Sequence, residues 1–317
     1  MELKELEYIV TIADEGRISR AAERLYLAQS SLSQFLQRCE AELGTRLFVR
    51  TGSGVRPTPA GEIFIRSARE LLRQFQRTKE ELKDTGQAPR GHIDLGLSSF
   101  RGSFLIPAVL DRFRRDYPGV EVHIAEHDSA VLQRKIAASE LDMALVALRP
   151  GQKKPEDEAV LRDEVCLVVN RSHPAMEYVH YGHRSRPWIE LEKTGKYEYL
   201  LSNRTTVLGN VAEEVFARCG IEPPALNRDL TAAFAQAMAC QGLGLAFTYA
   251  SCVTWRSDVE YVSLGREPYF VDLVLSFPPD AYRSRSLRAL EKMIRDFYRD
   301  RNLPQRGQPS GFPPAAI

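Results

Sequence analysis

Two short stretches of helically spaced apolar residues stand near the start of the chain, separated by a few residues around Leu27. The stretches 18–25 and 32–43 each place apolar residues at steps of three and four, so each predicts a short amphipathic helix. The small residues Ala21 and Ala22 suit close packing between them. Two such helices joined by a tight turn predict a helix-turn-helix, the unit that lays its second helix in a DNA major groove. An ordinary helical hairpin with a solvated polar face is the alternative.

The outward face of the second helix carries hydroxyl, carboxamide and guanidinium groups, with no acidic residue before Glu40. Such groups can pair with base edges and phosphates. We therefore expect double-stranded DNA as a partner, with this face reading bases and residues on or beside a wing holding the backbone. The expected DNA-binding residues are Ser19, Gln29, Ser30, Ser31, Ser33, Gln34, Arg38, Arg50 and Thr58.

The segments around this pair complete a winged motif. Apolar residues at helical spacing over 3–13 predict a preceding helix. Two short strands, 47–50 and 55–56, flank a turn of glycine and hydroxyl residues and predict a hairpin, or wing. The charge supports this reading, because residues 17–58 hold seven basic side chains against three acidic ones although the whole chain has a net charge of only +1.

Residues 61–86 read as one long amphipathic helix. Its apolar residues alternate steps of four and three, which is the spacing of a coiled-coil seam with Thr78 as a weak point. We expect a linker helix that forms a homodimer, while a helix packed on its own domain is the alternative. The expected dimerisation residues are Phe64, Ala68, Leu71, Phe75 and Leu82.

Beyond the glycine- and proline-containing stretch 85–91, strands and helices alternate. This order predicts a parallel sheet covered on both faces. The expected strands are 92–97, 120–126, 141–148, 165–169, 199–202, 243–249 and 269–277, and the expected helices are 104–117, 129–139, 207–220 and 287–301.

Length and composition exclude several classes of protein. With 317 residues and 44% hydrophobic content, the chain should form two to three globular domains. No apolar run reaches the length of a membrane span, and the acidic start excludes a signal peptide, so we expect no membrane partner and a cytoplasmic location. The five scattered cysteines fit buried, reduced thiols. No catalytic serine, phosphate-loop or dinucleotide motif is present, so we expect no enzyme, no catalytic residues and no cofactor.

The order of winged helix-turn-helix, linker helix and α/β pair strongly resembles the LysR-type transcriptional regulators of bacteria. The resemblance covers residues 1 to about 303. It rests on Ala21-Ala22 with Leu25, Gln29-Ser30 with Leu32-Ser33, Leu43-Gly44 with Leu47-Phe48 and Arg50, and Thr58-Pro59-Ala60-Gly61. Further landmarks are Pro118 with Val120, Leu141-Asp142 with Ala144, His173-Pro174 and Gly242-Leu243-Gly244.

The resemblance implies an α/β fold overall, with an N-terminal all-α winged helix-turn-helix and a two-lobed effector domain like a periplasmic-binding protein. The implied divisions are a DNA-binding domain at 1–61, a linker helix at 62–88, effector lobe 1 at 89–166 with 269–303, effector lobe 2 at 167–268 and a disordered tail at 304–317. It also implies promoter DNA as target, a homodimer that pairs into a homotetramer, and RNA polymerase as a further candidate partner.

The sequence departs from the family pattern in three places. Ala28 and Ser30 stand where the family often has a capping threonine and a proline, so Gln29 or Ser30 should cap the recognition helix instead. The connection 177–197 is longer than usual and contains His180 and His183, but no acidic or cysteine cluster accompanies them, so we expect no metal site. Phe247-Thr248-Tyr249 replaces the usual apolar-proline ending.

A small-molecule effector should bind where strands end and helices begin in the two lobes. The available hydroxyl and amide groups favour a polar or anionic effector, although Phe100 and Phe247 could stack an aromatic ring. Each serine could instead be only a helix cap, and Arg101 could be a surface residue. The expected effector-binding residues are Ser98, Ser99, Arg101, Asp128, Ser129, Ser202, Asn203 and Thr248. The alternative function is a DNA-binding regulator whose second half only oligomerises and senses no ligand.

Overall fold

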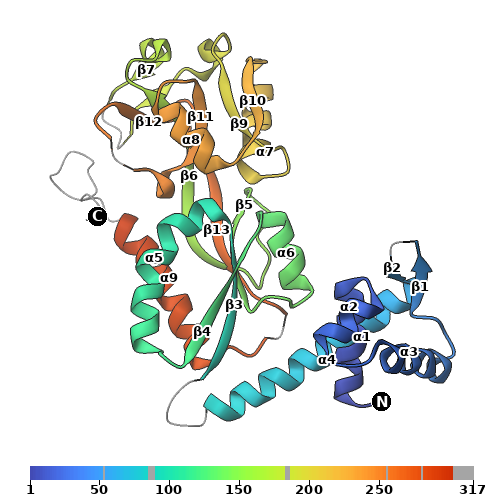
Figure 1. Ribbon diagram of the computed structural model, residues 1–317. Helices are drawn as coiled ribbons and strands as arrows, with labels where there is room; N and C mark the ends of the chain where they lie inside the picture. The colour runs from blue at the N-terminus through green and yellow to red at the C-terminus, as the bar shows by residue number, and fades with distance from the viewer. Residues whose placement is uncertain (53, 85–89, 183–185, 255, 280, 303–317) are drawn as a thin grey trace. The chain divides into compact units, whose positions relative to one another are not determined.

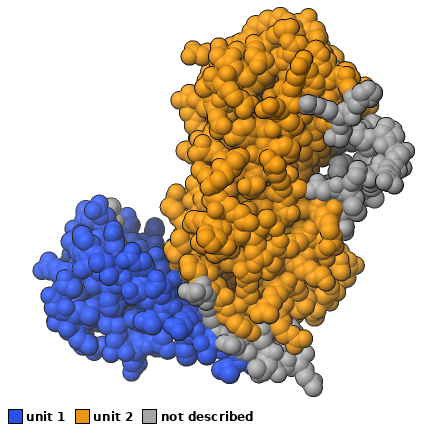
Figure 2. Space-filling view, turned by 180° about the vertical axis from the view of Figure 1, so that it is seen from behind, with its two compact units in different colours: residues 1–88 blue, residues 89–317 orange. Residues whose placement is uncertain are grey.

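The computed structural model describes residues 1–52, 54–84, 90–182, 186–254, 256–279 and 281–302. The chain divides into two compact units, Met1–Ala88 and Pro89–Ile317, which Figure 2 colours separately. The expected tail at 304–317, the end of the linker segment at 85–88 and His183 lie outside the described residues.

Unit 1 begins with three helices, α1 (Leu3–Glu15), α2 (Ile18–Arg24) and α3 (Gln29–Leu43). Their apolar stripes meet in one core around the fully buried side chains of Ile9, Ile12 and Leu32. Gly16 and Gly44 end α1 and α3 in the left-handed conformation, which glycine adopts without a steric cost. The predicted helix-turn-helix is therefore formed.

A short antiparallel hairpin of β1 (Phe48–Thr51) and β2 (Gly54–Pro57) follows, which is the predicted wing. The carboxylate of Glu40 accepts hydrogen bonds from the backbone N–H groups of Leu47, at 2.7 Å, and Phe48, at 3.0 Å. These bonds tie the start of the hairpin to α3, so the wing and the second helix are held as one surface.

Helix α4 (Pro59–Asp84) continues from the wing. The Thr58 hydroxyl accepts a hydrogen bond from the Gly61 N–H at 2.9 Å and thereby caps the helix. Gly61 packs so closely on the preceding chain that a Cβ there would lie 1.9 Å from the Leu47 carbonyl oxygen. The Thr-Pro-Ala-Gly motif thus fixes where α4 starts and how it packs.

Unit 2 contains a large twisted sheet with the strand order β10-β9-β11-β6-β13-β5-β3-β4 (Figure 1). In addition, β12 pairs with β6 and β8, and β7 pairs with β8. Its strands are β3 (Gly91–Leu97), β4 (Val120–Glu126), β5 (Met143–Leu148), β6 (Glu158–Asn170), β7 (Val179–His180), β8 (Trp188–Ile189), β9 (Tyr199–Ser202), β10 (Ala225–Leu230), β11 (Leu245–Tyr249), β12 (Val259–Ser263) and β13 (Tyr269–Ser276).

The expectation of a parallel sheet was wrong for the centre of unit 2. β3 pairs in parallel with β4 and β5, and β9 with β10 and β11. The long strands β6 and β13, however, are antiparallel to each other, β6 is antiparallel to β11, and β13 is antiparallel to β5. They cross between two groups of parallel strands (Figure 1), so the sheet is mixed and the chain passes twice between the lobes.

Two separate cores define the two lobes. In lobe 1, α5 (Ser99–Asp116) and α9 (Arg285–Asn302) cover one face of the sheet and α6 (Ser129–Ala137) covers the other. In lobe 2, α7 (Val207–Cys219) and α8 (Ala232–Cys240) cover opposite faces. Short 3₁₀ helices, η1 (Pro174–Tyr178), η2 (Leu191–Thr194) and η3 (Ala250–Cys252), complete lobe 2.

Several elements differ from the expectation. Helix α5 begins at Ser99 rather than at Phe104, because the Ser98 hydroxyl accepts a hydrogen bond from the Arg101 N–H at 3.5 Å and caps it. β10, α8 and β12 were not predicted. The sequence of α8 is apolar at almost every position, including the exposed Phe234, so it lacks the amphipathic stripe on which the prediction relied.

Candidate DNA interface and effector site

The exposed face of α3 is a continuous polar stripe. Ser30, Gln34 and Arg38 follow one another at steps of four, which places them along one side of the helix. All three are exposed, while Ser33 beside them is half-buried. Leu32 and Phe35 point into the core on the opposite side. Gln29, Ser31 and, on α2, Ser19 are also exposed.

The start of α3 differs from the prediction. Ala28 occupies the N-cap position, and no side chain makes a capping hydrogen bond there. The expectation that Gln29 or Ser30 caps the helix is wrong, because both lie inside its first turn. Their side chains stay exposed at the N-terminus of the helix, where backbone N–H groups also point outward.

The remaining DNA-binding candidates are held differently. Arg38 makes an ion pair with Glu5 at 3.2 Å and is 72% exposed, so a phosphate could take the place of this carboxylate. Arg50 on the wing is exposed. The Thr58 hydroxyl donates a hydrogen bond to the Arg46 carbonyl at 2.7 Å besides capping α4. Thr58 therefore already has a structural role.

The predicted dimerisation residues divide into two groups along α4. Ala68 is buried, and Phe64 is half-buried against the core of unit 1. Leu71, Phe75 and Leu82 are 51%, 43% and 66% exposed. The face that contacts α1 in the first half of α4 thus continues as an uncovered apolar stripe in the second half.

The strand registers of unit 2 bring the carboxyl ends of the parallel strands of both lobes to one junction. At the end of β5, Leu148 pairs with Asp272 of β13, which pairs with Arg162 of β6. At the end of β11, Tyr249 pairs with Val165 of β6. Arg162 and Val165 are three residues apart, or about 10 Å along a strand. The predicted effector residues lie at the ends of β3, β4 and β9, which run parallel to β5 or β11 within their lobes, and Thr248 lies in β11 itself.

In lobe 1, these candidates lie at two helix N-termini. Ser98 caps α5, and Ser99 is the exposed first residue of that helix. Asp128 is exposed at the N-cap of α6 without making a capping bond. The Ser129 hydroxyl accepts a hydrogen bond from the Ala147 N–H of β5 at 3.1 Å, which holds α6 to the sheet.

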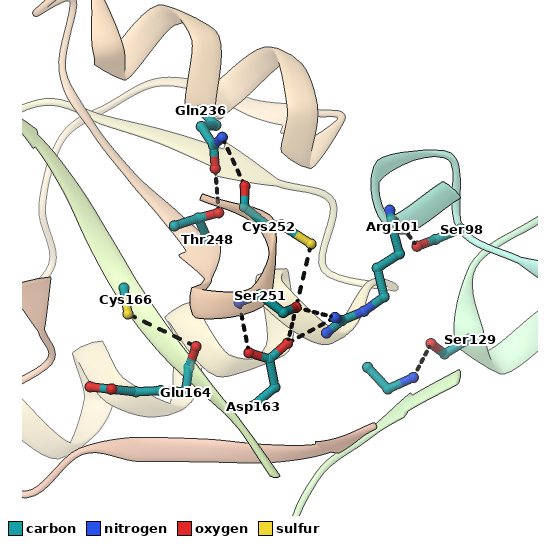
Figure 3. Close-up of polar contacts among 11 residues, drawn as sticks. Ser98, Arg101, Ser129, Asp163, Glu164, Cys166, Gln236, Thr248, Ser251 and Cys252 are labelled. Atoms are coloured by element: carbon teal, nitrogen blue, oxygen red, sulfur yellow. Dashed lines mark hydrogen bonds and ion pairs between the residues drawn. The ribbon is translucent and has the colours of Figure 1, made fainter. Parts of the chain in front are cut away.

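In lobe 2, the candidates are more engaged. Ser202 is buried at the end of β9. The Asn203 amide donates a hydrogen bond to Asp229 and accepts one from the Thr205 N–H at 2.8 Å. Thr248 is fully buried, and its hydroxyl donates to Gln236 of α8 (Figure 3). Of these three side chains, only that of Asn203 has substantial exposed surface.

Arg101 is neither on the surface nor open to a ligand. Its side chain is 2% exposed, and Nη1 donates hydrogen bonds to Asp163 of β6 at 2.8 Å and to Ser251 of η3 at 2.9 Å (Figure 3). The guanidinium also stacks on the ring of Tyr249, 3.9 Å from its centroid. Burial alone would lower the pKa of Arg101, but the charge of Asp163 outweighs it, and the pKa lies above its ordinary value.

The aromatic rings suggested for stacking an effector are also part of the interior. Phe247 packs among Tyr199 and Phe216 in the core of lobe 2. Phe100 packs against Phe104 and Tyr249. Both are less than 10% exposed, so the expectation that they offer a stacking surface was wrong. The replacement of the usual proline ending changes the core of lobe 2.

Asp163, Ser251 and Gln236 were not predicted. A signal existed for Asp163, because Leu161, Asp163 and Val165 alternate along β6 and the side chain of Val165 points inward. A signal also existed for Arg101, which shares the helical stripe of the buried residues Leu105 and Val109. Starting the helix at Phe104 hid that relation.

Other features of the described residues do not add a second candidate site. His180 is paired with Glu190 at 2.6 Å, and no group of three or more potential metal ligands occurs among the described residues. An open cavity of 570 Å³ is lined by Ala281, Tyr282, Arg283, Arg288 and Glu291, none of which was predicted. Within the described part of the chain, no helix is both long and apolar enough to span a membrane.

A winged helix-turn-helix joined through a long helix to a two-lobed α/β unit defines a DNA-binding regulator with a ligand-binding type of domain. The comparisons with known families agree. Residues 3–62 match the family described as bacterial regulatory helix-turn-helix protein, lysR family. Residues 86–299 match the LysR substrate binding domain. The chain belongs to the LysR family of transcriptional regulators, which confirms the resemblance.

Several relatives and solved structures are similar along nearly the whole chain. A probable RuBisCO transcriptional regulator of Thalassiosira pseudonana is 27% identical over 293 residues, covering 90% of this chain and 94% of the relative. The nitrogen assimilation regulatory protein nac of Escherichia coli (strain K12) is 25% identical over 303 residues, covering 93% and 94%. These relatives are transcriptional regulators.

Among solved structures, a full-length OxyR variant from Pseudomonas aeruginosa has a TM-score of 0.70 at 24% identity, covering 93% of this chain and 95% of that one. Full-length CbnR complexed with its target DNA has a TM-score of 0.60 at 20% identity, covering 93% and 99%. At these identities the likeness shows the fold alone, and it confirms the predicted fold class.

Proposed function

We propose that this regulator binds promoter DNA as a homo-oligomer, reading bases with α3 and holding the backbone with the wing. The observation that carries the proposal is the exposed stripe of Ser30, Gln34 and Arg38, with Ser19, Gln29, Ser31 and Ser33 around it. All of these side chains except the half-buried Ser33 are exposed, and their hydroxyl, amide and guanidinium groups match base edges and phosphates. Arg50 extends the basic surface onto the wing.

The test compares two variants on duplexes selected from a random pool at fixed salt. Gln34→Ala should relax preference at one base step by about 1 to 3 kcal/mol, because one base contact is lost. Arg50→Ala should weaken all sequences alike and lower the salt slope by about 1. Gln241→Ala, exposed in unit 2, is the control that should change neither. A Gln34→Ala protein with full specificity would refute the placement of the reading face.

A dimer through α4 fits the uncovered stripe of Leu71, Phe75 and Leu82. Two reading heads related by a two-fold axis imply an interrupted palindrome as the operator. The family resemblance suggests a palindrome whose core is a thymine and an adenine held at a fixed spacing. We further propose that dimers pair into a tetramer through contacts between copies of unit 2. RNA polymerase is a further proposed partner, and the protein is proposed to act in the cytoplasm.

A small polar or anionic effector is proposed to bind where the strand ends of the two lobes meet. Ser99 and Asp128 are exposed there, Ser129 is half-buried, and Asn203 lies at the corresponding end of lobe 2. The N-termini of α5 and α6 add backbone donors to the serine hydroxyls, which suits a carboxylate or a phosphate. Four of the predicted residues have a structural role instead, because their polar groups are already bonded or buried: Ser98, Arg101, Ser202 and Thr248.

The effector proposal is tested by thermal shift against a panel of small carboxylates, phosphates and neutral polar compounds. A binding compound should raise the melting temperature of the unaltered protein, and Ser99→Ala should weaken this response while DNA affinity stays intact. Ser103→Ala, exposed on the same helix, is the control. If Ser99→Ala lost operator binding and kept its ligand response, Ser99 would have a structural role and the effector site would be wrongly placed.

A further inference from the structure

A buried polar cluster lies where the lobes of unit 2 join, and it connects several elements. Arg101 comes from the first turn of α5, Asp163 from β6 and Ser251 from η3. Figure 3 shows the three side chains converging on one another. Tyr249 at the end of β11 stacks on the guanidinium. Burial raises the pKa of the Tyr298 hydroxyl in α9, and the charge of Arg101 opposes this shift.

The bonds within the cluster pass from one lobe to the other. Arg101 belongs to a helix of lobe 1, and Nη1 donates a hydrogen bond at 2.9 Å to the hydroxyl oxygen of Ser251, which follows the end of β11 in lobe 2. That hydroxyl donates to Asp163 Oδ2 at 2.6 Å, and the Ser251 N–H donates to Asp163 Oδ1 at 3.0 Å. Asp163 itself lies on a crossing strand. Ser251 is therefore the lobe 2 end of a tie that is anchored in lobe 1.

We propose that the Arg101–Asp163–Ser251 cluster is the tie that sets the angle between the lobes in the absence of effector. Arg101 acts as a positioning residue, because its anchored side chain fixes the first turn of α5 and with it Ser98 and Ser99. The tie thereby controls the geometry of the proposed effector site. Its effect on ligand binding rests on that proposed site, but its effect on the lobe angle does not.

One buried donor of the cluster lacks a hydrogen bond within the described part of the chain. Arg101 Nη2 is buried and has no hydrogen-bond partner among the described residues. A buried donor without a partner destabilises the arrangement that contains it, so a second arrangement that supplies a partner is favoured by comparison. The polar contact between the lobes therefore rests on the two hydrogen bonds of Nη1.

A second polar contact between the lobes is of a different kind. Arg149, at the end of β5, lies 3.9 Å from Glu214 of α7, and the two side chains are 42% and 47% exposed. Solvent screens such a pair, so it constrains the lobes much less than a buried one. It provides a matched variant, since Arg149→Gln removes an interlobe contact without disturbing the buried cluster.

The experiment measures the distance between lobes in the full chain without DNA or effector. Spin labels carried by non-canonical residues at the exposed positions Ala108 in α5 and Ala217 in α7 report it by pulsed electron resonance. Ser251→Ala removes the hydroxyl but leaves the Arg101–Asp163 pair, so the protein should fold. We expect a wider distance distribution and exchange of the residue 251 amide hydrogen faster on the order of tenfold.

Three comparison variants make the result specific. Ser251→Thr keeps a hydroxyl and should restore the narrow distribution, while Arg149→Gln and Ser103→Ala should leave it unchanged. An unchanged distribution in Ser251→Ala, or equal widening in Ser103→Ala, would overturn the proposal. Because neither DNA nor effector is present, this outcome is independent of whether the proposed effector site is correct.

Discussion

The polar stripe of α3 and the polar cluster around Arg101 use the same kinds of side chains in opposite environments. Arg38 is 72% exposed and its carboxylate partner Glu5 25%, whereas Arg101 and Asp163 are 2% and 1% exposed. In water an ion pair contributes little, because solvent screens it and the side chains lose entropy. In the interior, each partner depends on the other for its solvation.

Because of this difference in burial, the two regions tolerate substitutions differently. The exposed side chains of the α3 stripe can change at little cost to the fold, so in the proposed function they are available to set DNA sequence preference. Side chains in the buried cluster cannot change singly without destabilising unit 2. The first region is therefore suited to determining which DNA is bound, and the second to holding a defined geometry.

The largest expected effect breaks the buried pair. Asp163→Ala leaves the guanidinium of Arg101 buried without its counterion and should lower the free energy of unfolding of unit 2 by about 3 to 5 kcal/mol. Urea unfolding of the full chain, followed by circular dichroism, measures it. Asp116→Ala removes an exposed partner, 4.0 Å from Arg112, and should cost less than about 0.5 kcal/mol. Equal losses in the two variants would show that the buried pair stabilises the fold no more than the exposed one.

The next effect concerns an exposed apolar surface in unit 1. Glutamates at Leu71 and Phe75 should convert dimers to monomers and weaken operator binding by about 100-fold or more, because two linked reading heads bind far more tightly than one. Light scattering and a binding titration measure the two quantities. Ile63→Glu, 59% exposed on another side of α4, is the matched control. A double variant that stayed dimeric and bound would defeat the seam assignment.

A smaller effect tests the packing of unit 1. Gly61→Ala places a Cβ 1.9 Å from the Leu47 carbonyl oxygen, so α4 must shift, and unit 1 should lose about 1 to 3 kcal/mol of stability. Gly52→Ala has no atom within 4 Å of the added Cβ and should be nearly neutral. Thermal unfolding monitored by circular dichroism distinguishes them. Unchanged stability in Gly61→Ala would show that the Thr58–Gly61 turn is not tightly packed.

The smallest effect is a pH dependence in lobe 2. Burial lowers the pKa of His173, whose Nδ1 also accepts a hydrogen bond from the Ala175 N–H at 3.1 Å. The unfolded chain then binds more protons than the folded one, so stability is present above the ordinary histidine pKa of about 6.5 and falls as the pH drops below it. His173→Gln should reduce the change in melting temperature between pH 7.5 and 5.5. An identical change in both proteins would show that other groups cause it.

Much of the fold could be predicted because it depends on local spacing. The strands 120–126 and 199–202 have the predicted bounds, and α3 ends at Leu43, where its predicted apolar stretch ends. Strand direction at the centre of unit 2 could not be predicted in this way. Whether β6 and β13 run parallel or antiparallel is decided by residues about a hundred positions apart in the sequence, and both directions give the same apolar pattern.

The candidate sites show the same division. Exposure of Gln34 follows from its place on an amphipathic helix. The partners of Arg101 come from β6 and η3, 62 and 150 residues further along the chain. With the helix predicted to begin at Phe104, Arg101 preceded a helix N-terminus, where a guanidinium is expected to bind an anion. The role of Arg101 therefore required the three-dimensional arrangement, although its helical stripe already indicated burial.

The pairing of β6 with β13 has a consequence for how the chain is made. Val165 pairs with Tyr269, so the two ends of the lobe 2 segment leave and re-enter lobe 1 side by side, as in an inserted domain. The core of lobe 1 also needs Leu273 and Leu275 of β13 and Leu290 and Ile294 of α9. During synthesis, the whole sequence of lobe 2 is made before the last helix of lobe 1, α9. A nonsense codon shortly before α9 would therefore release a chain with a finished second lobe on an unfinished first one.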